Sequence, residues 1–323
     1  ATAAMPVALA QEGSAAAASR TPTGKVPAAV SVLSIVEHPS LDALRDGLHD
    51  ELKDAGYQDG KSLHWAYQSA QGNQGTAVQI ARKFVGSQPA AILAISTPAA
   101  QAVVAATKQI PVVYGAVTDP VAAQLVKTMG PSGTNVTGVS DRLEPGRQVE
   151  LIRKIVPSVK TVGMIYNPAE ANSKVAVNEM KAALSKAGIE LVEAAAPRSV
   201  DVGQAARRLV GKVDLIYTGT DNNVVAAYEA VAKVGNDAKI PLVAADTGSI
   251  RRGALAVLSV DYRDLGKQAG KQIVRILKGE KPGDMASETS ENLVLILNLE
   301  AARKQGVELS AQLQSEASEI LGR

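Results

Sequence analysis

Polar side chains that could hold a small charged molecule recur in this sequence directly after short apolar runs. Such runs cover residues 91–95 and 214–218, and small hydroxyl, amide or acidic residues follow them. Hydroxyl groups and free backbone N–H groups at helix starts can receive a carboxylate, and aspartates can receive an ammonium group. The candidate ligand-binding residues are Glu37, His38, Ser96, Thr97, Thr118, Asp119, Asn167, Asp221, Asn222, Asp246 and Thr247. Together they suit a zwitterion such as an amino acid.

The expected roles within this set divide by charge. We expect Ser96 and Thr97, with the N–H groups of the helix that follows them, to receive the carboxylate. We expect Asp221 and Asp246 to hold the amino group. We expect Thr118, Asp119 and Asn167 to orient the ligand by hydrogen bonds. Glu37 and His38 are expected to line the wall of the site next to the ligand's side chain.

Helix capping is the competing interpretation of the same residues. Serine, threonine, aspartate and asparagine are the preferred N-cap residues, and proline favours the first helical turn. Any single position is therefore more readily a cap than a ligand contact, at about two to one. The whole set is more informative than any single residue, because residues that serve only as caps need not gather at one edge of each of two sheets.

The elements that must position these residues follow from the spacing of apolar side chains. Short apolar runs alternate with amphipathic segments, which predicts parallel sheets covered by helices on both faces. The pattern restarts after a glycine-rich stretch, so we expect two α/β domains, each with a doubly wound parallel sheet, and a break near residues 135–141. Strands are expected at residues 30–36, 63–67, 91–95, 112–116, 161–166, 191–195, 214–218, 242–245, 255–260 and 293–297.

Composition limits the classes of function. The chain has 323 residues, of which 46% are hydrophobic. It has 34 Lys and Arg residues and 32 Asp and Glu residues, so its net charge is +2 (34 − 32). This is not the excess of positive charge that is typical of a nucleic-acid-binding protein. No apolar run reaches the roughly 18 residues of a membrane span. There are no cysteines and three histidines, which argues against disulfides, thiol chemistry and histidine-rich metal sites, and we expect no cofactor.

The first 25 residues differ in composition from the rest. Residues 1–25 are rich in alanine, serine, threonine, proline and glycine, and Ala8-Leu9-Ala10 before Gln11 is typical of a signal-peptidase site. We expect a leader remnant here, on a protein exported to the periplasm without a cysteine-linked lipid anchor. A low-complexity linker is the alternative.

The residues at the strand ends also carry a family resemblance. From about Val26 to Ser310, the chain resembles the TrpX-like substrate-binding proteins of ABC transporters. The matching stretches, in order, are Glu37-His38-Pro39-Ser40, Thr118-Asp119-Pro120, Tyr166-Asn167-Pro168, Gly219-Thr220-Asp221-Asn222, Asp246-Thr247-Gly248-Ser249 and Arg252-Gly253-Ala254.

The resemblance implies a type I periplasmic-binding-protein fold, with two lobes joined by three crossovers and a ligand between them. By this analogy, the N-terminal lobe holds residues 26–139 and 261–279, and the C-terminal lobe holds 140–260 and 280–323. It also implies closure about the hinge, a monomer, an ABC permease in the inner membrane as partner, and an amino-acid ligand, often aromatic. The shortage of aromatic residues (one Trp, one Phe and seven Tyr) weakens the aromatic expectation.

Two other classes of function remain open. His38, Ser96 and Asp119 could form a hydrolytic triad, and Glu170 and Asp221 a carboxylate pair, but the Gly-x-Ser-x-Gly elbow is missing. We therefore expect no enzymatic activity. The other alternative is a ligand-sensing receptor or regulator domain of the same fold.

Overall fold

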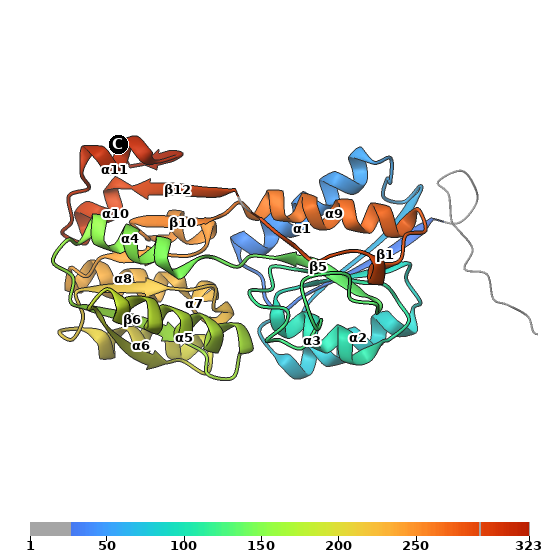
Figure 1. The fold of residues 1–323 in the computed structure, drawn as a ribbon, viewed down its shortest axis with the longest axis horizontal. Helices are drawn as coiled ribbons and strands as arrows, with labels where there is room; N and C mark the ends of the chain where they lie inside the picture. The colour runs from blue at the N-terminus through green and yellow to red at the C-terminus, as the bar shows by residue number, and fades with distance from the viewer. Residues whose placement is uncertain (1–26, 291, 323) are drawn as a thin grey trace, which may run out of the picture.

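The computed structural model describes residues 27–290 and 292–322, which form two α/β lobes side by side along the long axis of the molecule (Figure 1). Each lobe is built on its own sheet. The leader expected over residues 1–25 lies outside the described residues.

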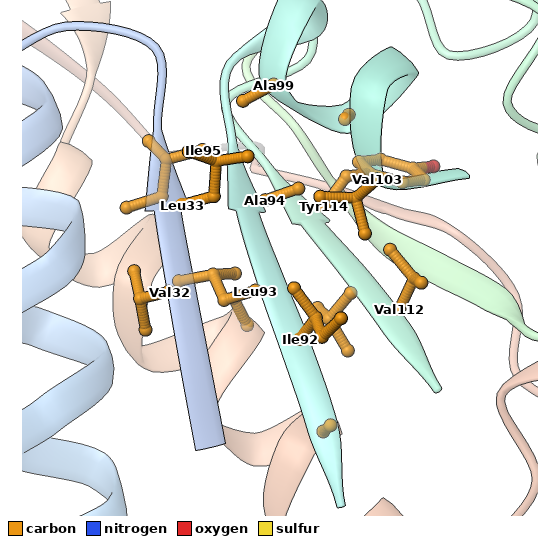
Figure 2. Packing of buried hydrophobic residues seen from close by; sticks show 14 of the residues in the cluster. Val32, Leu33, Ile92, Leu93, Ala94, Ile95, Ala99, Val103, Val112 and Tyr114 are labelled. Carbon is orange, nitrogen blue, oxygen red and sulfur yellow. The ribbon is translucent and has the colours of Figure 1, made fainter. Parts of the chain in front are cut away.

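The first lobe contains a parallel sheet with the strand order β2-β1-β3-β4-β5-β11. Its strands β3 and β4 are apolar along their whole length because helices cover both faces. Leu33, Ala94 and Tyr114, which are in register on three neighbouring strands, belong to the core that Figure 2 shows. The strands are β1 Ala28–Ser34, β2 Leu63–Ser69, β3 Ala91–Ile95, β4 Val112–Gly115, β5 Val136–Ser140 and β11 Glu288–Thr289.

The second lobe repeats this winding in the strand order β7-β6-β8-β9-β10-β12-β13. The pairing of β12 with β10 is antiparallel, and the other strand pairs are parallel. The strands are β6 Thr161–Tyr166, β7 Glu190–Ala195, β8 Leu215–Thr218, β9 Leu242–Ala244, β10 Ala256–Val260, β12 Leu293–Asn298 and β13 Glu319–Leu321.

Helices cover the sheets of both lobes. In the first lobe they are α1 Pro39–Asp54, α2 Gln74–Gly86, α3 Thr97–Ala106, α9 Tyr262–Leu277 and the 3-10 turn η3 Pro282–Asp284. In the second they are α4 Pro145–Ile155, α5 Ala171–Lys186, α6 Val202–Leu209, α7 Asn222–Ala226, α8 Tyr228–Ala238, α10 Leu299–Lys304, α11 Ala311–Glu316 and the 3-10 turns η1 Ser199–Asp201 and η2 Thr247–Arg252.

The chain passes between the lobes after β5, after β10 and between β11 and β12. The expected break at residues 135–141 contains β5, which the short sequence Val-Thr-Gly-Val-Ser concealed. Because β11 pairs with β5, we propose that residues 280–290 also belong to the first lobe, with the third crossover near residue 290.

Helix α9 returns to the first lobe after the second crossover and packs against α1 with almost no gap (Figure 1). A Cβ atom added to Gly266 would lie 2.0 Å from the Leu44 carbonyl oxygen, and one added to Gly47 would lie 2.1 Å from the Arg263 carbonyl oxygen. Glycine is therefore required where the two helix backbones touch. This contact holds the second crossover in place.

The close contact makes Gly266→Ala destabilising. We expect the free energy of unfolding, measured with urea, to fall by about 2 kcal/mol or more, because overpacking a tight contact displaces backbone. Gly86→Ala is the matched control: the Cβ position at this exposed helix end has nothing within 4 Å, and we expect no loss of stability there. Equal effects of the two substitutions would contradict the contact.

Candidate functional site

The winding of each sheet defines one point where a ligand can bind. In a doubly wound sheet, ligands bind beyond the carboxyl ends of the two strands at which the strand order reverses. These strands are β1 and β3 in the first lobe, and β6 and β8 in the second. His38 and Ser96 follow the first pair, and Asn172 and Asn222 lie at the starts of the helices that follow the second pair.

These residues from the two lobes line one small cavity of about 10 Å³. Its polar lining consists of His38, Ser96, Asp141, Asn172, Thr220, Asn222, Asp246 and Tyr262, and its apolar lining of Leu41, Ala116 and Val225. No lysine or arginine belongs to the described lining. The cavity is far smaller than the about 300–1,000 Å³ of ordinary ligand pockets, so the lobes must separate to admit a solute.

Two carboxylates of the cavity are fully enclosed and bonded to uncharged donors. Asp246 Oδ1 accepts from Ser40 Oγ (2.7 Å), and Asp141 accepts from Tyr262 Oη (2.9 Å) and Thr118 Oγ1 (3.2 Å). Burial raises the pKa of both carboxyl groups, and these hydrogen bonds oppose the shift. The cavity is therefore lined with acceptors that suit a cation.

The same contacts join the lobes. Ser40 belongs to the first lobe and Asp246 to the second, and Gly248 N of the second lobe also donates to Ser40 Oγ (3.0 Å). Thr118 and Thr220, again from different lobes, lie 3.2 Å apart between their Oγ1 atoms. Asp246 also accepts from Ser249 N (3.1 Å) and Ser249 Oγ (2.5 Å) of its own lobe, so the Ser40 hydrogen bond is the part of its coordination that requires the lobes to be together.

A third buried carboxylate, Glu170, lies behind the asparagines of the second lobe. It accepts from Nδ2 of Asn222 (2.7 Å), Asn172 (3.2 Å) and Asn167 (3.4 Å). Burial, with the negative charge of Asp221 as the next cause, raises the pKa of Glu170 to about 7. Asn172 Oδ1 is buried without a hydrogen-bond partner in the described chain. Because Asn172 lines the cavity, this oxygen is an acceptor left for a ligand.

Two adjacent turns of the cavity wall have left-handed backbone. Ser96 has φ 81° and ψ 156°, and Ala116 has φ 53°, and neither is a glycine. Such conformations cost about 1–3 kcal/mol each and are common at ligand sites. Ser96 precedes α3, whose first turn receives no hydrogen bond from a capping side chain in the part of the chain described.

His38 caps α1 and is neutral. Its Nδ1 accepts from Leu41 N (3.5 Å), and burial, followed by the positive charge of Arg252, lowers its pKa to about 3. It therefore stays uncharged near neutral pH and contributes shape and hydrogen bonding to the wall of the cavity.

The structure brings together only some of the residues expected from sequence. His38, Ser96, Asn222 and Asp246 line the cavity, and Thr118 supports it through Asp141. Thr97 is buried at the start of α3, next to Ser96, and Thr247 is half-buried after Asp246.

Asp221, Asp119 and Glu37 lie outside the described lining of the polar cavity and are bonded to other residues of the chain. Asp221 accepts from Asn167 N (2.6 Å), Ser173 Oγ (2.6 Å) and Val224 N (3.0 Å), so it caps α7, and its expected contact with an amino group stays a prediction. Asn167 likewise serves this internal network. Asp119 pairs with Arg142 (2.9 Å) and caps its own turn, and the exposed Glu37 bonds to Tyr67 and Gln71. Capping hydrogen bonds are present at both aspartates, and also at Asp246, which accepts from Ser249 N (3.1 Å) at the start of η2.

Sequence reasoning missed the acceptors at the hinge and behind the asparagines. Asp141 follows β5, the strand that was not recognised, and Tyr262 follows β10 at the second crossover. Asn172 lies in the first turn of α5 and was not singled out, Thr220 stood in a matching stretch without a binding role, and Glu170 was considered only as part of a catalytic carboxylate pair. The signal that could have found Asp141 is the general one, a polar residue just after a strand.

A second cavity adjoins the first at Asp141 and Thr220. It has about 40 Å³ and an apolar side formed by Leu143, Met180 and Tyr217. Burial raises the pKa of Tyr217 beyond its usual range, so its hydroxyl stays protonated. The polar cavity therefore borders an apolar wall.

The described residues hold no group of three or more histidine or acidic side chains placed to bind a metal ion. None of their helices combines the length and the apolar character needed to cross a bilayer.

Two lobes wound alike, with a polar cavity between them and a chain that crosses three times, define a hinged binding protein. The sequence profile of the ABC transporter substrate binding protein family matches residues 29–321. The chain belongs to this family, and the predicted class of protein is confirmed. The type I fold is also confirmed: a glucose-galactose binding protein from Geobacillus stearothermophilus, 16% identical, matches with a TM-score of 0.61 over 84% of this chain and 98% of that chain.

Several proteins are more similar. A "Tyrosine-binding protein" of Clostridioides difficile is 42% identical over 269 residues, 83% of this chain and 78% of its own length. A conserved domain protein from Vibrio cholerae is 44% identical, with a TM-score of 0.90 over 91% of this chain and all of that chain.

Two further solved structures differ in state. An ABC domain from Streptococcus pneumonia in complex with L-Trp is 34% identical, with a TM-score of 0.88 over 92% of this chain and 100% of that chain. A ligand-free, open substrate binding protein from Clostridium difficile is 39% identical, with a TM-score of 0.69 over 92% of this chain and 100% of that chain.

The strained turn at Ser96 gives a test of the site's geometry. Ser96→Gly removes the side chain that disfavours φ 81°, so we expect the free energy of unfolding to rise by about 1 kcal/mol. Ser185→Gly, at an exposed position inside α5, should instead lower it by about 0.5 kcal/mol. The same sign for both substitutions in urea unfolding would contradict the strain.

Proposed function

We propose that this chain binds an aromatic L-amino acid in the cavity between its lobes, outside the cytoplasm, and passes it to an ABC permease. The observation that carries the proposal is the set of buried acceptors in the cavity: the carboxylates of Asp141 and Asp246 and the free Oδ1 of Asn172. A monomer and export to the periplasm are part of the proposal.

The ammonium group of the ligand supplies the missing cation. Buried carboxylates without a cationic partner are costly, and hydroxyl donors compensate them only in part. An ammonium group has three N–H donors, which matches two carboxylates and one amide oxygen. We assign its binding to Asp141, Asp246 and Asn172, in place of Asp221.

The carboxylate of the ligand belongs at the start of α3. Ser96 turns sharply there, and the positive end of the helix dipole points into the site. The Ser96 hydroxyl and the N–H groups of Thr97 and Ala99 are the donors in reach of this turn, because Pro98 has none. These roles of Ser96 and Thr97 are the ones expected from sequence.

The aromatic side chain is supported by the second cavity and by the relatives. Leu143, Met180 and Tyr217 offer an apolar wall beside Asp141, and an aromatic ring gains from contact with a tyrosine ring. The names of two relatives specify tyrosine and L-Trp. Few aromatic residues are needed when one of them lines the cavity.

Hinge closure is the conformational step. The described structure resembles the L-Trp complex (TM-score 0.88) more closely than the ligand-free open structure (0.69), although the open protein is more similar in sequence. A ligand that touches both lobes favours the closed state by the contacts available only there. The Ser40–Asp246 and Thr118–Thr220 contacts are formed in that state.

Calorimetric titration with free amino acids tests the proposal. We expect L-tyrosine or L-tryptophan to bind with a Kd of about 1 μM or tighter, equivalent to about −8 kcal/mol, and L-alanine far more weakly. N-acetyl-L-tyrosine, which lacks the ammonium group, should not bind. Equal binding of the acetylated compound would overturn the assignment, and binding of no amino acid would overturn the function.

Asp141→Asn tests the cation site within the protein. We expect a loss in affinity of about 10- to 100-fold, since a hydrogen bond to a charged group is worth about 1.5–3 kcal/mol. Asp237→Asn, at an exposed residue paired with Lys233, is the control and should leave the Kd unchanged. An unchanged Kd for Asp141→Asn would remove Asp141 from the site.

A further inference from the structure

The amide groups of the second lobe have a fixed direction because of the carboxylate behind them. An ionised carboxylate can only accept hydrogen bonds, so a neighbouring asparagine must turn its nitrogen toward it and its oxygen away. Glu170 receives the nitrogen of Asn222 at 2.7 Å and that of Asn172 at 3.2 Å. Both asparagines line the ligand cavity, whereas Glu170 does not.

The two asparagines differ in what else holds them. Asn172 Nδ2 also donates to the Thr220 carbonyl oxygen (3.3 Å), which keeps this amide in place whatever the state of Glu170. Glu170 is the only acceptor recorded for Asn222 Nδ2 within the described residues. The orientation of Asn222 therefore depends on Glu170 alone.

Protonation of Glu170 would reverse that orientation. A protonated carboxyl group is a donor and seeks an acceptor, and the oxygen of Asn222 is the acceptor that a rotation of the amide would supply. The rotated amide would then turn its NH2 group toward the cavity. Beside the three ammonium ligands Asp141, Asp246 and Asn172, an acceptor of the cavity wall would then be replaced by a donor, which the positive ammonium group disfavours.

We propose that Glu170 is a positioning residue that sets the polarity of the cavity wall beside the ligand's ammonium site through the amide of Asn222, so that ligand binding requires ionised Glu170. This proposal rests on the function proposed above and adds a residue that does not touch the ligand. It also makes ligand affinity depend on pH.

The surroundings of Glu170 place this dependence near neutral pH. Burial and the charge of Asp221 raise the pKa of Glu170 to about 7. The groups around Glu170 come from three places. Asn167 and Asn172, on its own segment, are neutral, and Asp221 and Asn222 face it from the start of α7. The titratable groups of the cavity are Asp141, Asp246 and His38. His38 is already neutral, with its pKa at about 3. Because binding needs the ionised form, affinity is full above pH 7 and is lost as the pH falls.

The test is the Kd for L-tyrosine or L-tryptophan, whichever binds, measured at pH 8, 7 and 6. For the unsubstituted protein we expect affinity to fall about tenfold from pH 8 to pH 6, as complete coupling to one group of pKa about 7 requires. At pH 7, calorimetry in buffers of different ionisation enthalpy should show release of about half a proton on binding. A flat profile without proton release would overturn the proposal.

Glu170→Gln assigns the dependence to this residue. We expect weaker binding at pH 8, by about tenfold, together with loss of the pH dependence and of proton release, because glutamine has no proton to lose. Asn222→Ala, which removes the responding amide, should also flatten the profile. Glu193→Gln, on the exposed surface of the same lobe, should keep the original profile.

The outcomes separate this inference from the proposed function. If the unsubstituted protein binds the amino acid and Glu170→Gln retains the full pH dependence, the role of Glu170 is wrong and the function stands. If no amino acid binds the unsubstituted protein at any of the three pH values, the function itself fails.

Discussion

The buried negative charge between the lobes is the constraint on which the rest of the structure depends. Asp141 and Asp246 are enclosed in a cavity whose described lining contains no lysine or arginine and whose histidine, His38, is neutral. Ser40 donates to Asp246 from the other lobe, while Ser249 donates to it from its own lobe, and Thr118 and Tyr262 donate to Asp141. The Ser40 hydrogen bond ties part of the stabilisation of this charge to the relative position of the lobes.

The scaffold explains how such a site can be held and still open. In each sheet, the ligand side is the edge formed by the carboxyl ends of the strands. Because both lobes are wound in the same way, the points at which their strand order reverses face each other. Helix α9 is fastened to α1 at Gly47 and Gly266, so the second crossover, which carries Tyr262, has a rigid base in the first lobe. Asp141 lies on the first crossover. The hinge therefore contributes directly to the site, and movement of the lobes alters the hydrogen bonds of its carboxylates.

The sequence was sufficient for the fold and for part of the site. Strands expected at 91–95 and 161–166 coincide with β3 and β6, because buried parallel strands are uniformly apolar. β5 was missed, since Thr137 and Gly138 interrupt its apolar character, and Asp141 was missed with it. The capping role of Asp221 could not be separated from ligand binding, because both need an acidic residue at a helix start. The orientation of Asn222 depends on the distant Glu170 and has no local signature.

Ligand-induced approach of the lobes is the measurement that tests the central claim most directly. The sequence has no cysteine, so Lys83→Cys on α2 and Lys186→Cys on α5 can be labelled without interference and their separation followed by energy transfer. We predict that L-tyrosine or L-tryptophan, whichever binds, shortens this distance in a saturable way, and that N-acetyl-L-tyrosine does not. A distance that stays constant while an amino acid binds would contradict the account, because the ligand would then bind without bringing the two lobes together.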